Sequence, residues 1–168
     1  MPTKDEEDFL KKIPADKIVK IYPFDTKVIK VVKEILDSIK NIYSDLEVKH
    51  MGASALGISG QNDVDIYALS NPVDFEKYLL GLIKIFGEPL HKHETFIEWK
   101  FNKNGFDIEF YLTSPDSKTM RRQIKVFETL MNNKDLLKEY ENLKESMNGK
   151  SFREYQKKKY EFYNKIIK

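Results

Sequence analysis

The stretch KHMGASALGISGQNDVDIYAL, residues 49–69, decides the fold of this chain and carries its strongest functional signal. A short apolar run ends in a turn of small residues at 52–54, and a β-branched and aromatic run begins at Asp63. Successive side chains of a strand point to opposite faces, so Asp63 and Asp65 point the same way. Two carboxylates beside apolar neighbours repel each other, and a bound cation relieves that repulsion. A small-residue turn followed by such a pair indicates a site for a nucleoside triphosphate with Mg²⁺.

The small-residue turn is the part that would hold phosphate. The side chains of Gly52 and Ala53 are small enough for the backbone to approach an anion, and the Ser54 hydroxyl adds a hydrogen-bond donor. The alternative is an ordinary strand-to-helix turn, because glycine and serine occur in every kind of loop. The acidic pair that follows along the chain favours the phosphate-binding interpretation of this turn.

A second acidic pair lies in the run FDIEF at residues 106–110. Asp107 and Glu109 are also two positions apart, so they share one face of their strand. Two-metal phosphoryl transfer needs at least one carboxylate beyond the first pair, and both residues are candidates for it. The competing interpretation is that all four carboxylates line the solvent face of an antiparallel sheet.

The composition of the chain narrows its class. Its 168 residues suit one domain, and a net charge of +2 does not indicate a nucleic-acid binder that works by bulk charge, so we predict no DNA specificity. The absence of cysteine excludes disulfides, zinc–thiolate sites and thiol catalysis. Residues 1–12 are charged and contain no apolar stretch of signal-peptide or membrane-span length. We therefore expect a cytoplasmic protein with no membrane partner.

The order of the expected elements predicts an α+β fold with a small mixed β-sheet, flanking helices and a helical C-terminal region. Proline after Asn71 marks a helix start, and Gly87 closes that helix. A turn ending in Asn-Gly joins two alternating runs into a hairpin. The expected strands are 46–51, 63–69, 96–101 and 106–112, preceded by an extended segment at 18–23 and a helix from about 25 to 39. We expect one domain over 1–168: a flexible segment at 1–16, an α/β catalytic core at 17–115 and C-terminal helices at 116–168.

Basic residues near the start of the C-terminal region are further candidates. Arg121 and Arg122, with Lys118, open a helix after the hairpin and could neutralise a triphosphate, and we expect Arg121 to bind nucleotide. The alternative is a solvated face that carries a like-charge pair. The run QKKK at 156–159, between two tyrosines, has the same two interpretations, with RNA as the contact.

These motifs together resemble the nucleotidyltransferase superfamily that includes DNA polymerase β. Its pattern is a hydrophobic residue, Gly, then Gly or Ser, followed by Asp-x-Asp or Asp-x-Glu and a third carboxylate on a later strand. Met51 and Gly52 match the start, although Ala53 stands where Gly or Ser is usual. The resemblance implies that Asp63, Asp65 and Asp107 are the catalytic carboxylates. It implies the same three as ligands of Mg²⁺, with Glu109 as an alternative or additional ligand.

A closer resemblance, to the GrpB-like branch of that superfamily, covers most of the chain. The turn His50–Ile58 is similar to the branch's His-x-Gly-Ser-Thr-Ser/Ala segment, with Leu56 in place of a proline, and residues 136–144 are similar to its Leu-x-x-x-Tyr-x-x-Leu-Lys segment. Many members lack a full Asp-x-Asp, whereas this chain has Asp65 and a second acidic pair.

The resemblance implies a Mg²⁺-dependent nucleotidyltransferase that uses a nucleoside triphosphate such as ATP. The acceptor hydroxyl could belong to a small molecule, a protein or an RNA. The alternative function is a non-catalytic nucleotide-binding or protein-interaction module of the GrpB-like type.

Overall fold

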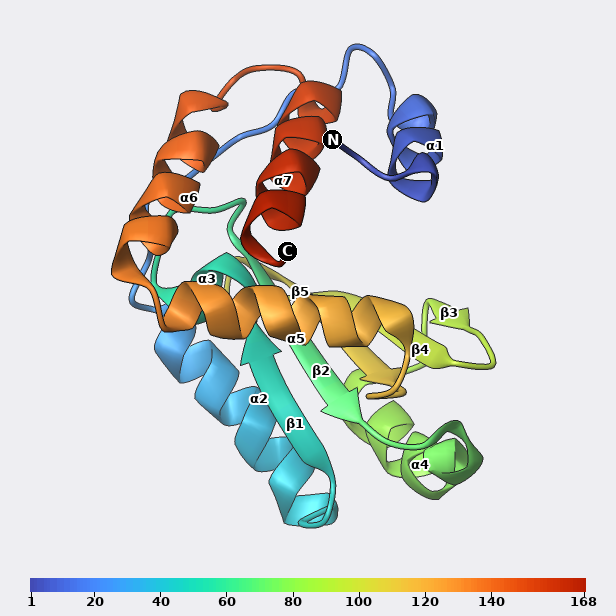
Figure 1. Ribbon diagram of the computed structural model, residues 1–168. Helices are drawn as coiled ribbons and strands as arrows, with labels where there is room; N and C mark the ends of the chain where they lie inside the picture. The colour runs from blue at the N-terminus through green and yellow to red at the C-terminus, as the bar shows by residue number, and fades with distance from the viewer.

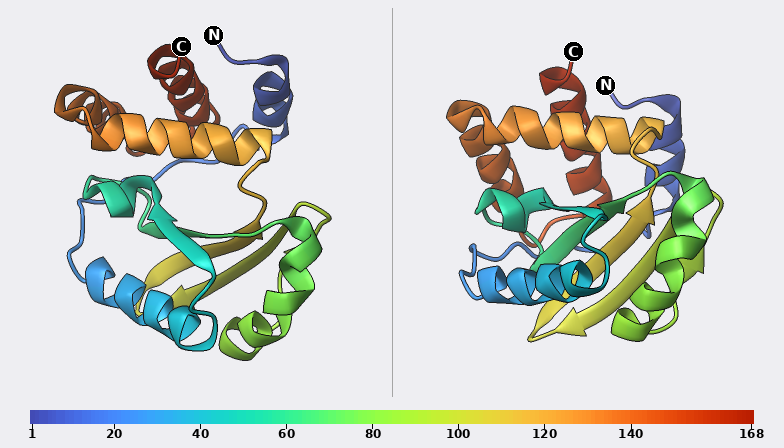
Figure 2. Two further views of the ribbon diagram at one scale, coloured as in Figure 1. Left: turned by 60° about the horizontal axis from the view of Figure 1, so that its bottom comes forward. Right: turned by 90° about the horizontal axis from the view of Figure 1, so that it is seen from below.

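A five-stranded mixed sheet lies between two layers of helices in the computed structural model, which describes residues 1–168 (Figures 1 and 2). The strand order is β1-β2-β5-β4-β3; β2 and β5 are parallel, and the other neighbours are antiparallel. The strands are β1 Glu47–Met51, β2 Asp63–Leu69, β3 His91–Lys92, β4 Phe96–Lys103 and β5 Phe106–Thr113. The helices are α1 Lys4–Lys12, α2 Val28–Ile42, α3 Gly52–Leu56, α4 Phe75–Phe86, α5 Lys118–Met131, α6 Lys134–Ser146 and α7 Phe152–Ile166. The predicted α+β class with C-terminal helices is confirmed.

The main core lies between the sheet and the pair α2 and α4. Along β2 and β5 the side chains alternate, so that Val64, Ile66, Ile108 and Phe110 are fully buried on this face. The apolar stripes of α2 and α4 cover them in one cluster. Because this face is filled, the acidic residues between the apolar ones point to the opposite face of the sheet.

The opposite face is covered by the C-terminal helices, and α5 crosses above it (Figure 2). Met120 of α5 packs on Met51 and Leu69, while Val126 and Leu130 pack with residues of α6 and α7. The extended segment predicted at 18–23 forms bridges from Ile18 to Ser151 and from Tyr22 to Gly60. The C-terminal helices therefore pack against the core and cover the face of the sheet that carries the acidic residues.

The helix start predicted at Asn71 and the turn predicted at Asn104-Gly105 are both present in the structure. Asn71 accepts a hydrogen bond from the Val73 amide and starts the 3-10 turn Pro72–Asp74 that leads into α4. Asn104 and Gly105, at φ angles of 51° and 87°, form the tight turn between β4 and β5. None of the helices combines the length and the apolar character that crossing a bilayer would require.

The N-terminal segment differs from expectation, because residues 4–12 of the predicted flexible stretch form helix α1. Thr3 and Glu6 make a reciprocal capping box at its start. Leu10 is buried, and α1 packs along α7 (Figure 1). This highly charged segment forms a helix because Leu10 and the Glu6 carboxylate are buried against residues that are distant in the sequence.

Candidate active site

Four carboxylates form an acidic patch on the face of the sheet that looks toward the C-terminal helices. In the register of the parallel pair β2 and β5, Asp63 lies opposite Asp107 and Asp65 lies opposite Glu109. Neighbouring strands are about 4.8 Å apart, so the two acidic pairs become one group. All four residues line a single cavity of about 590 Å³.

Burial and mutual repulsion disfavour the charged forms of two carboxylates of this patch, Asp63 and Asp65. Burial, with repulsion from Asp63 and Glu109, raises the pKa of Asp65 well above its ordinary value. Burial also raises the pKa of Asp63, although the charges of Lys159 and Lys144 act against that rise. Glu109 is ion-paired with Lys100 at 3.3 Å, and Asp107 is exposed and accepts a 3.4 Å hydrogen bond from Asn102. A cation at Asp65 and its neighbours would remove the repulsion.

A close contact with Asp65 explains why the turn at 52–54 begins with glycine. Gly52 has a φ angle of 80°, and a Cβ at this position would lie 2.5 Å from Oδ2 of Asp65. Only glycine fits this contact without displacing the carboxylate. The turn and the acidic pair are therefore packed against each other.

The donor set suits Mg²⁺, which prefers carboxylate oxygens and usually takes only one or two of them from the protein. No group of three or more acidic, histidine or cysteine side chains is arranged closely enough to form a ready-made metal site. Asp63 and Asp65 offer two carboxylate ligands beside the turn at Gly52, so oxygens of a ligand or of water would complete the coordination of a bound Mg²⁺. The metal assignments to Asp63, Asp65, Asp107 and Glu109 stay predictions.

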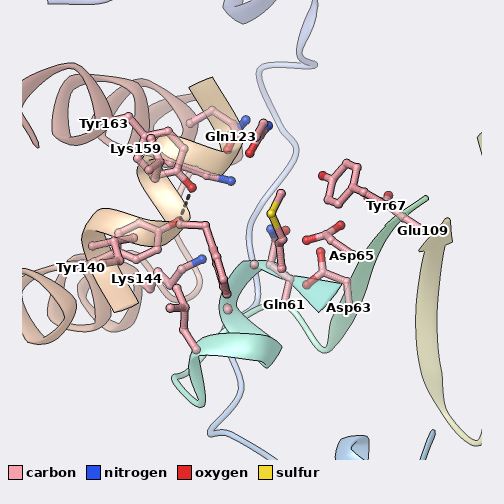
Figure 3. A pocket seen from close by; sticks show the side chains of 18 of the residues that line it. Gln61, Asp63, Asp65, Tyr67, Glu109, Gln123, Tyr140, Lys144, Lys159 and Tyr163 are labelled. Carbon is pink, nitrogen blue, oxygen red and sulfur yellow. Dashed lines mark hydrogen bonds between the residues drawn. The ribbon is translucent and has the colours of Figure 1, made fainter. Parts of the chain in front are cut away.

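Two lysines face the acidic patch from the helical wall (Figure 3). Lys144 of α6 is only 4% exposed, and its Nζ donates a 2.7 Å hydrogen bond to the Tyr155 hydroxyl. Burial and the nearby charge of Lys159 lower the pKa of Lys144 to about 7, although Asp63 and Asp65 act to raise it. An ammonium has three donors, so two remain free for a ligand.

Lys159 of α7 is the second cation of this wall. Burial acts to lower its pKa, but Tyr163, Tyr155 and the carboxylates of Asp65 and Asp63 outweigh that effect and raise it. Its Nζ lies 5.5 Å from the centre of the Tyr163 ring. Neither Lys159 nor Lys144 forms an ion pair with a carboxylate, so the acidic and basic walls face each other across an open cavity.

Aromatic and amide side chains complete the lining. The Tyr67 and Tyr111 rings stack at 5.2 Å on the sheet, and the hydroxyls of Tyr140 and Tyr163 are hydrogen-bonded at 2.9 Å on the helical wall. Gln61, Gln123 and Gln156 also line the cavity, and Figure 3 shows Gln123 on the same side as Lys159. A ligand with a flat ring and several phosphates would find a partner for each part.

The structure brings most of the predicted site residues together, with two exceptions. Gly52 and Ala53 line the cavity with the four carboxylates. Ser54 does not; its Oγ lies 2.8 Å from Nε2 of His50, whose pKa is lowered to about 4 by burial. Arg121 lies outside the lining, 70% exposed, and pairs with Asp116 at 3.5 Å. Arg121 is therefore directed away from the site that it was expected to serve.

The sequence places both lysines at positions that indicate an inward-facing side chain. Lys144 follows Tyr140 by one helical turn and precedes Met147, so it stands within an apolar stripe. Lys159 stands one turn from both Tyr155 and Tyr163 in the same way. A lysine inside an apolar or aromatic stripe is directed inward, where a charge needs a partner or a ligand.

Comparisons with known proteins give a family and a fold. A family model described as GrpB protein matches residues 18–168. A solved structure reported for the structural plasticity of Cid1 and its RNA terminal uridylyl transferase activity matches with a TM-score of 0.52 at 17% identity, over 83% of this chain and 43% of that chain. A structure of the Cid1 poly(U) polymerase with MgGTP bound gives a TM-score of 0.43 at 14% identity, over 82% of this chain and 46% of the other. No curated protein matches the sequence.

The chain spans less than half the length of the two solved structures that it matches. At 17% identity the first of them shows a shared nucleotidyltransferase-like fold and no more. The family match covers nearly the whole chain and confirms the resemblance read from the motifs. This chain belongs to the GrpB protein family.

Proposed function

We propose that this protein is a Mg²⁺-dependent nucleotidyltransferase whose cavity binds a nucleoside triphosphate between the acidic and the basic wall. The observation that carries the proposal is the pair of inward-facing lysines, Lys144 and Lys159, opposite Asp63 and Asp65. Neither set neutralises the other by direct contact, and both are desolvated. A metal–triphosphate complex carries cation and anion in one molecule and so satisfies both walls.

Burying a charge without a partner is unfavourable, so an inward-facing lysine needs an explanation. Lys144 has one hydrogen bond, to the Tyr155 hydroxyl, and lies near the Tyr140 ring, while Lys159 lies over the Tyr163 ring; neither lysine has a carboxylate partner. Phosphate oxygens are the natural third partner, since a lysine ammonium binds them as a point charge. In this arrangement Lys144 and Lys159 hold the β- and γ-phosphates from above, while the backbone at Gly52 and Ala53 approaches them from the sheet.

The proposed reaction is transfer of a nucleotidyl group to a hydroxyl. The acceptor oxygen bonds to the α-phosphorus while the bond from that phosphorus to the α,β-bridging oxygen breaks, and pyrophosphate leaves with the electron pair. The hydroxyl proton passes to a carboxylate at the β5 edge of the patch, Asp107 or Glu109, and from there to water. Mg²⁺, held by Asp63 and Asp65, would supply neutralisation of charge on the phosphate oxygens.

The first experiment is thermal stabilisation by ATP, CTP, GTP and UTP, with and without Mg²⁺. A ligand that binds only the folded state raises the midpoint of unfolding, by about 2.7 kcal/mol of stability at a hundred times its Kd. We expect a shift with at least one triphosphate and a larger one with Mg²⁺. No shift under any condition would refute the proposal.

The second experiment separates an enzyme from a binding module. Asp63→Asn should remove the Mg²⁺-dependent part of the shift and abolish release of pyrophosphate in the presence of candidate acceptors. Asp74→Asn, which changes an exposed aspartate at the start of α4 that does not line the cavity, is the control and should behave as wild type. Full transfer activity in Asp63→Asn would show that the assignment of the acidic pair is incorrect. Binding without transfer by the wild type would favour the non-catalytic module.

A further inference from the structure

A second cavity, of about 680 Å³, lies between α1, α5 and α7. Six residues line both this cavity and the first: Phe9, Gln123, Val126, Gln156, Lys159 and Tyr163. The two cavities therefore adjoin along these side chains, with Lys159 at the boundary. We call the second cavity the α1–α5–α7 groove.

One wall of the groove is α1, which a buried polar cluster fixes in place. The carboxylate of Glu6 pairs with Arg122 of α5 and accepts a 3.1 Å hydrogen bond from Asn164 of α7. Arg122 also donates a 2.9 Å hydrogen bond to Asn164. Helix α1 precedes residue 18, where the family match begins. The groove is thus partly built from residues outside the matched region.

The charges of the groove favour an anion. Lys4 and Lys118 are exposed and are the first residues of α1 and α5, and Lys159 lies at the boundary with the first cavity. Of the acidic residues in the lining, Glu6 is neutralised by Arg122, which leaves Asp5. Even with Lys159 engaged by a triphosphate, Lys4 and Lys118 outnumber the one remaining acidic residue of the lining, Asp5.

Its remaining side chains suit a flat ring. Phe9 is 46% exposed and meets the Tyr160 ring edge to face, with centroids 6.5 Å apart. Because Phe9 is nearly half exposed, part of its ring is accessible to a flat ligand. Gln123, at the boundary, makes no side-chain hydrogen bond within the protein, so its amide is free to bind a hydroxyl that passes into the first cavity.

We propose that the α1–α5–α7 groove binds the acceptor of the transfer reaction, and that this acceptor is a small phosphorylated molecule with a flat ring and a free hydroxyl, of about nucleotide size. This inference rests on the proposed function. The groove volume falls in the range of small-ligand pockets, about 300–1,000 Å³. A net charge of only +2 gives little bulk attraction for a long polyanion, which favours a small acceptor over a nucleic-acid polymer.

The test uses calorimetric titration of the full chain, first saturated with Mg²⁺ and a non-hydrolysable triphosphate, so that the first cavity is filled. The probes are AMP, ribose 5-phosphate and a short oligouridylate. We expect AMP to bind as a second ligand, more tightly than ribose 5-phosphate because its ring contacts Phe9. Lys118→Glu should weaken AMP binding by about tenfold or more, as expected for reversing a charge beside a phosphate. Phe9→Leu should remove the preference for AMP over ribose 5-phosphate.

Lys134→Glu is the matched control, since Lys134 is also the exposed first residue of a helix but lines neither cavity. It should leave AMP binding unchanged. The inference is overturned if neither phosphate probe binds, if Lys118→Glu and Phe9→Leu have no effect, or if the oligouridylate binds more tightly than AMP.

Failure of the proposed function is recognised separately. If the chain binds no triphosphate, AMP is titrated alone, and the position of its site is read from the variants. Loss of AMP binding in Lys118→Glu but not in Lys144→Met then supports a ligand in the groove without nucleotidyl transfer. The reverse pattern places AMP in the first cavity and overturns the inference.

Discussion

Replacing Lys144 by methionine is expected to stabilise the free protein and to abolish its response to a triphosphate. Methionine has nearly the shape of the lysine stem without its charge, so it can fill the space beside Tyr140 and Tyr155. A residue retained for stability would behave in the opposite way. The variant therefore separates a ligand-binding role of Lys144 from a structural one.

The magnitude follows from the pKa of the buried ammonium. Burial and the charge of Lys159 lower it from 10.5 to about 7. At about 1.36 kcal/mol per pKa unit, keeping Lys144 charged in the fold costs about 5 kcal/mol relative to water. Losing the hydrogen bond to Tyr155 removes about 1 kcal/mol, and imperfect packing removes about another. We expect a net gain of about 2–3 kcal/mol at low pH, or roughly 5–10 °C in Tm.

The pH dependence provides the refutation. Between about pH 7 and 10.5 the unfolded state binds one more proton at Lys144 than the native state, so wild-type stability rises with pH through that window. The difference between variant and wild type should be widest below about pH 7 and should fall toward pH 10.5. Urea unfolding at several pH values measures it, with Lys134→Met, an exposed lysine of α6, as control. A variant less stable than wild type at low pH, or a pH-independent difference, would refute the reasoning.

Three further predictions concern Lys144, the turn at Gly52 and helix α1. Triphosphate affinity should fall as pH rises through about 7, because Lys144 loses its proton beside Lys159, Asp63 and Asp65. In a binding titration at several pH values, Lys144→Arg should flatten this dependence, since arginine keeps its charge. A wild-type affinity that does not change with pH would contradict the prediction. Gly52→Ala should lower the free energy of unfolding by about 1–3 kcal/mol more than Gly57→Ala, because both glycines have positive φ but only a Cβ at position 52 meets Asp65. Equal losses of unfolding free energy in urea titrations of the two variants would contradict this close contact. Glu6→Gln should loosen α1 and speed proteolysis within residues 4–12, whereas Glu7→Gln, exposed on the same helix, should not.

The sheet and its acidic patch were predictable because their signals are local. Alternation along 63–69 and 106–113 fixes which side chains share a face, and Asn-Gly fixes the turn between β4 and β5. The parallel pairing of β2 with β5, which brings Asp63 beside Asp107, was not predicted; the family resemblance implied only that a third carboxylate lies on a later strand.

The sequence offered the run 156–159 only as a possible RNA contact, and it predicted neither a wall shared by Lys144 and Lys159 nor helix α1, because the residues that they contact are distant in the sequence. Lys159 is one of three consecutive lysines, and only the packing of α7 decides that it faces the cavity while its neighbours face solvent. Glu6 is one of three acidic residues in the first turn of α1, and only contact with Arg122 singles it out. Helical spacing relative to Tyr155 and Tyr163 was the available signal for Lys159.

The separation of the two charged walls is itself an argument for a ligand. If Asp63, Asp65, Lys144 and Lys159 served stability alone, direct ion pairs across the cavity would lower the cost of burying them. Instead, the carboxylates have raised pKa values, Lys144 has a lowered one, and an open space of about 590 Å³ keeps them apart. Each shift is a cost to the free protein that a molecule carrying both metal and phosphate would remove at once. Under the proposed function, the stability gained in Lys144→Met and the Mg²⁺-dependent stabilisation lost in Asp63→Asn therefore report one trade-off between the stability of the free protein and ligand binding.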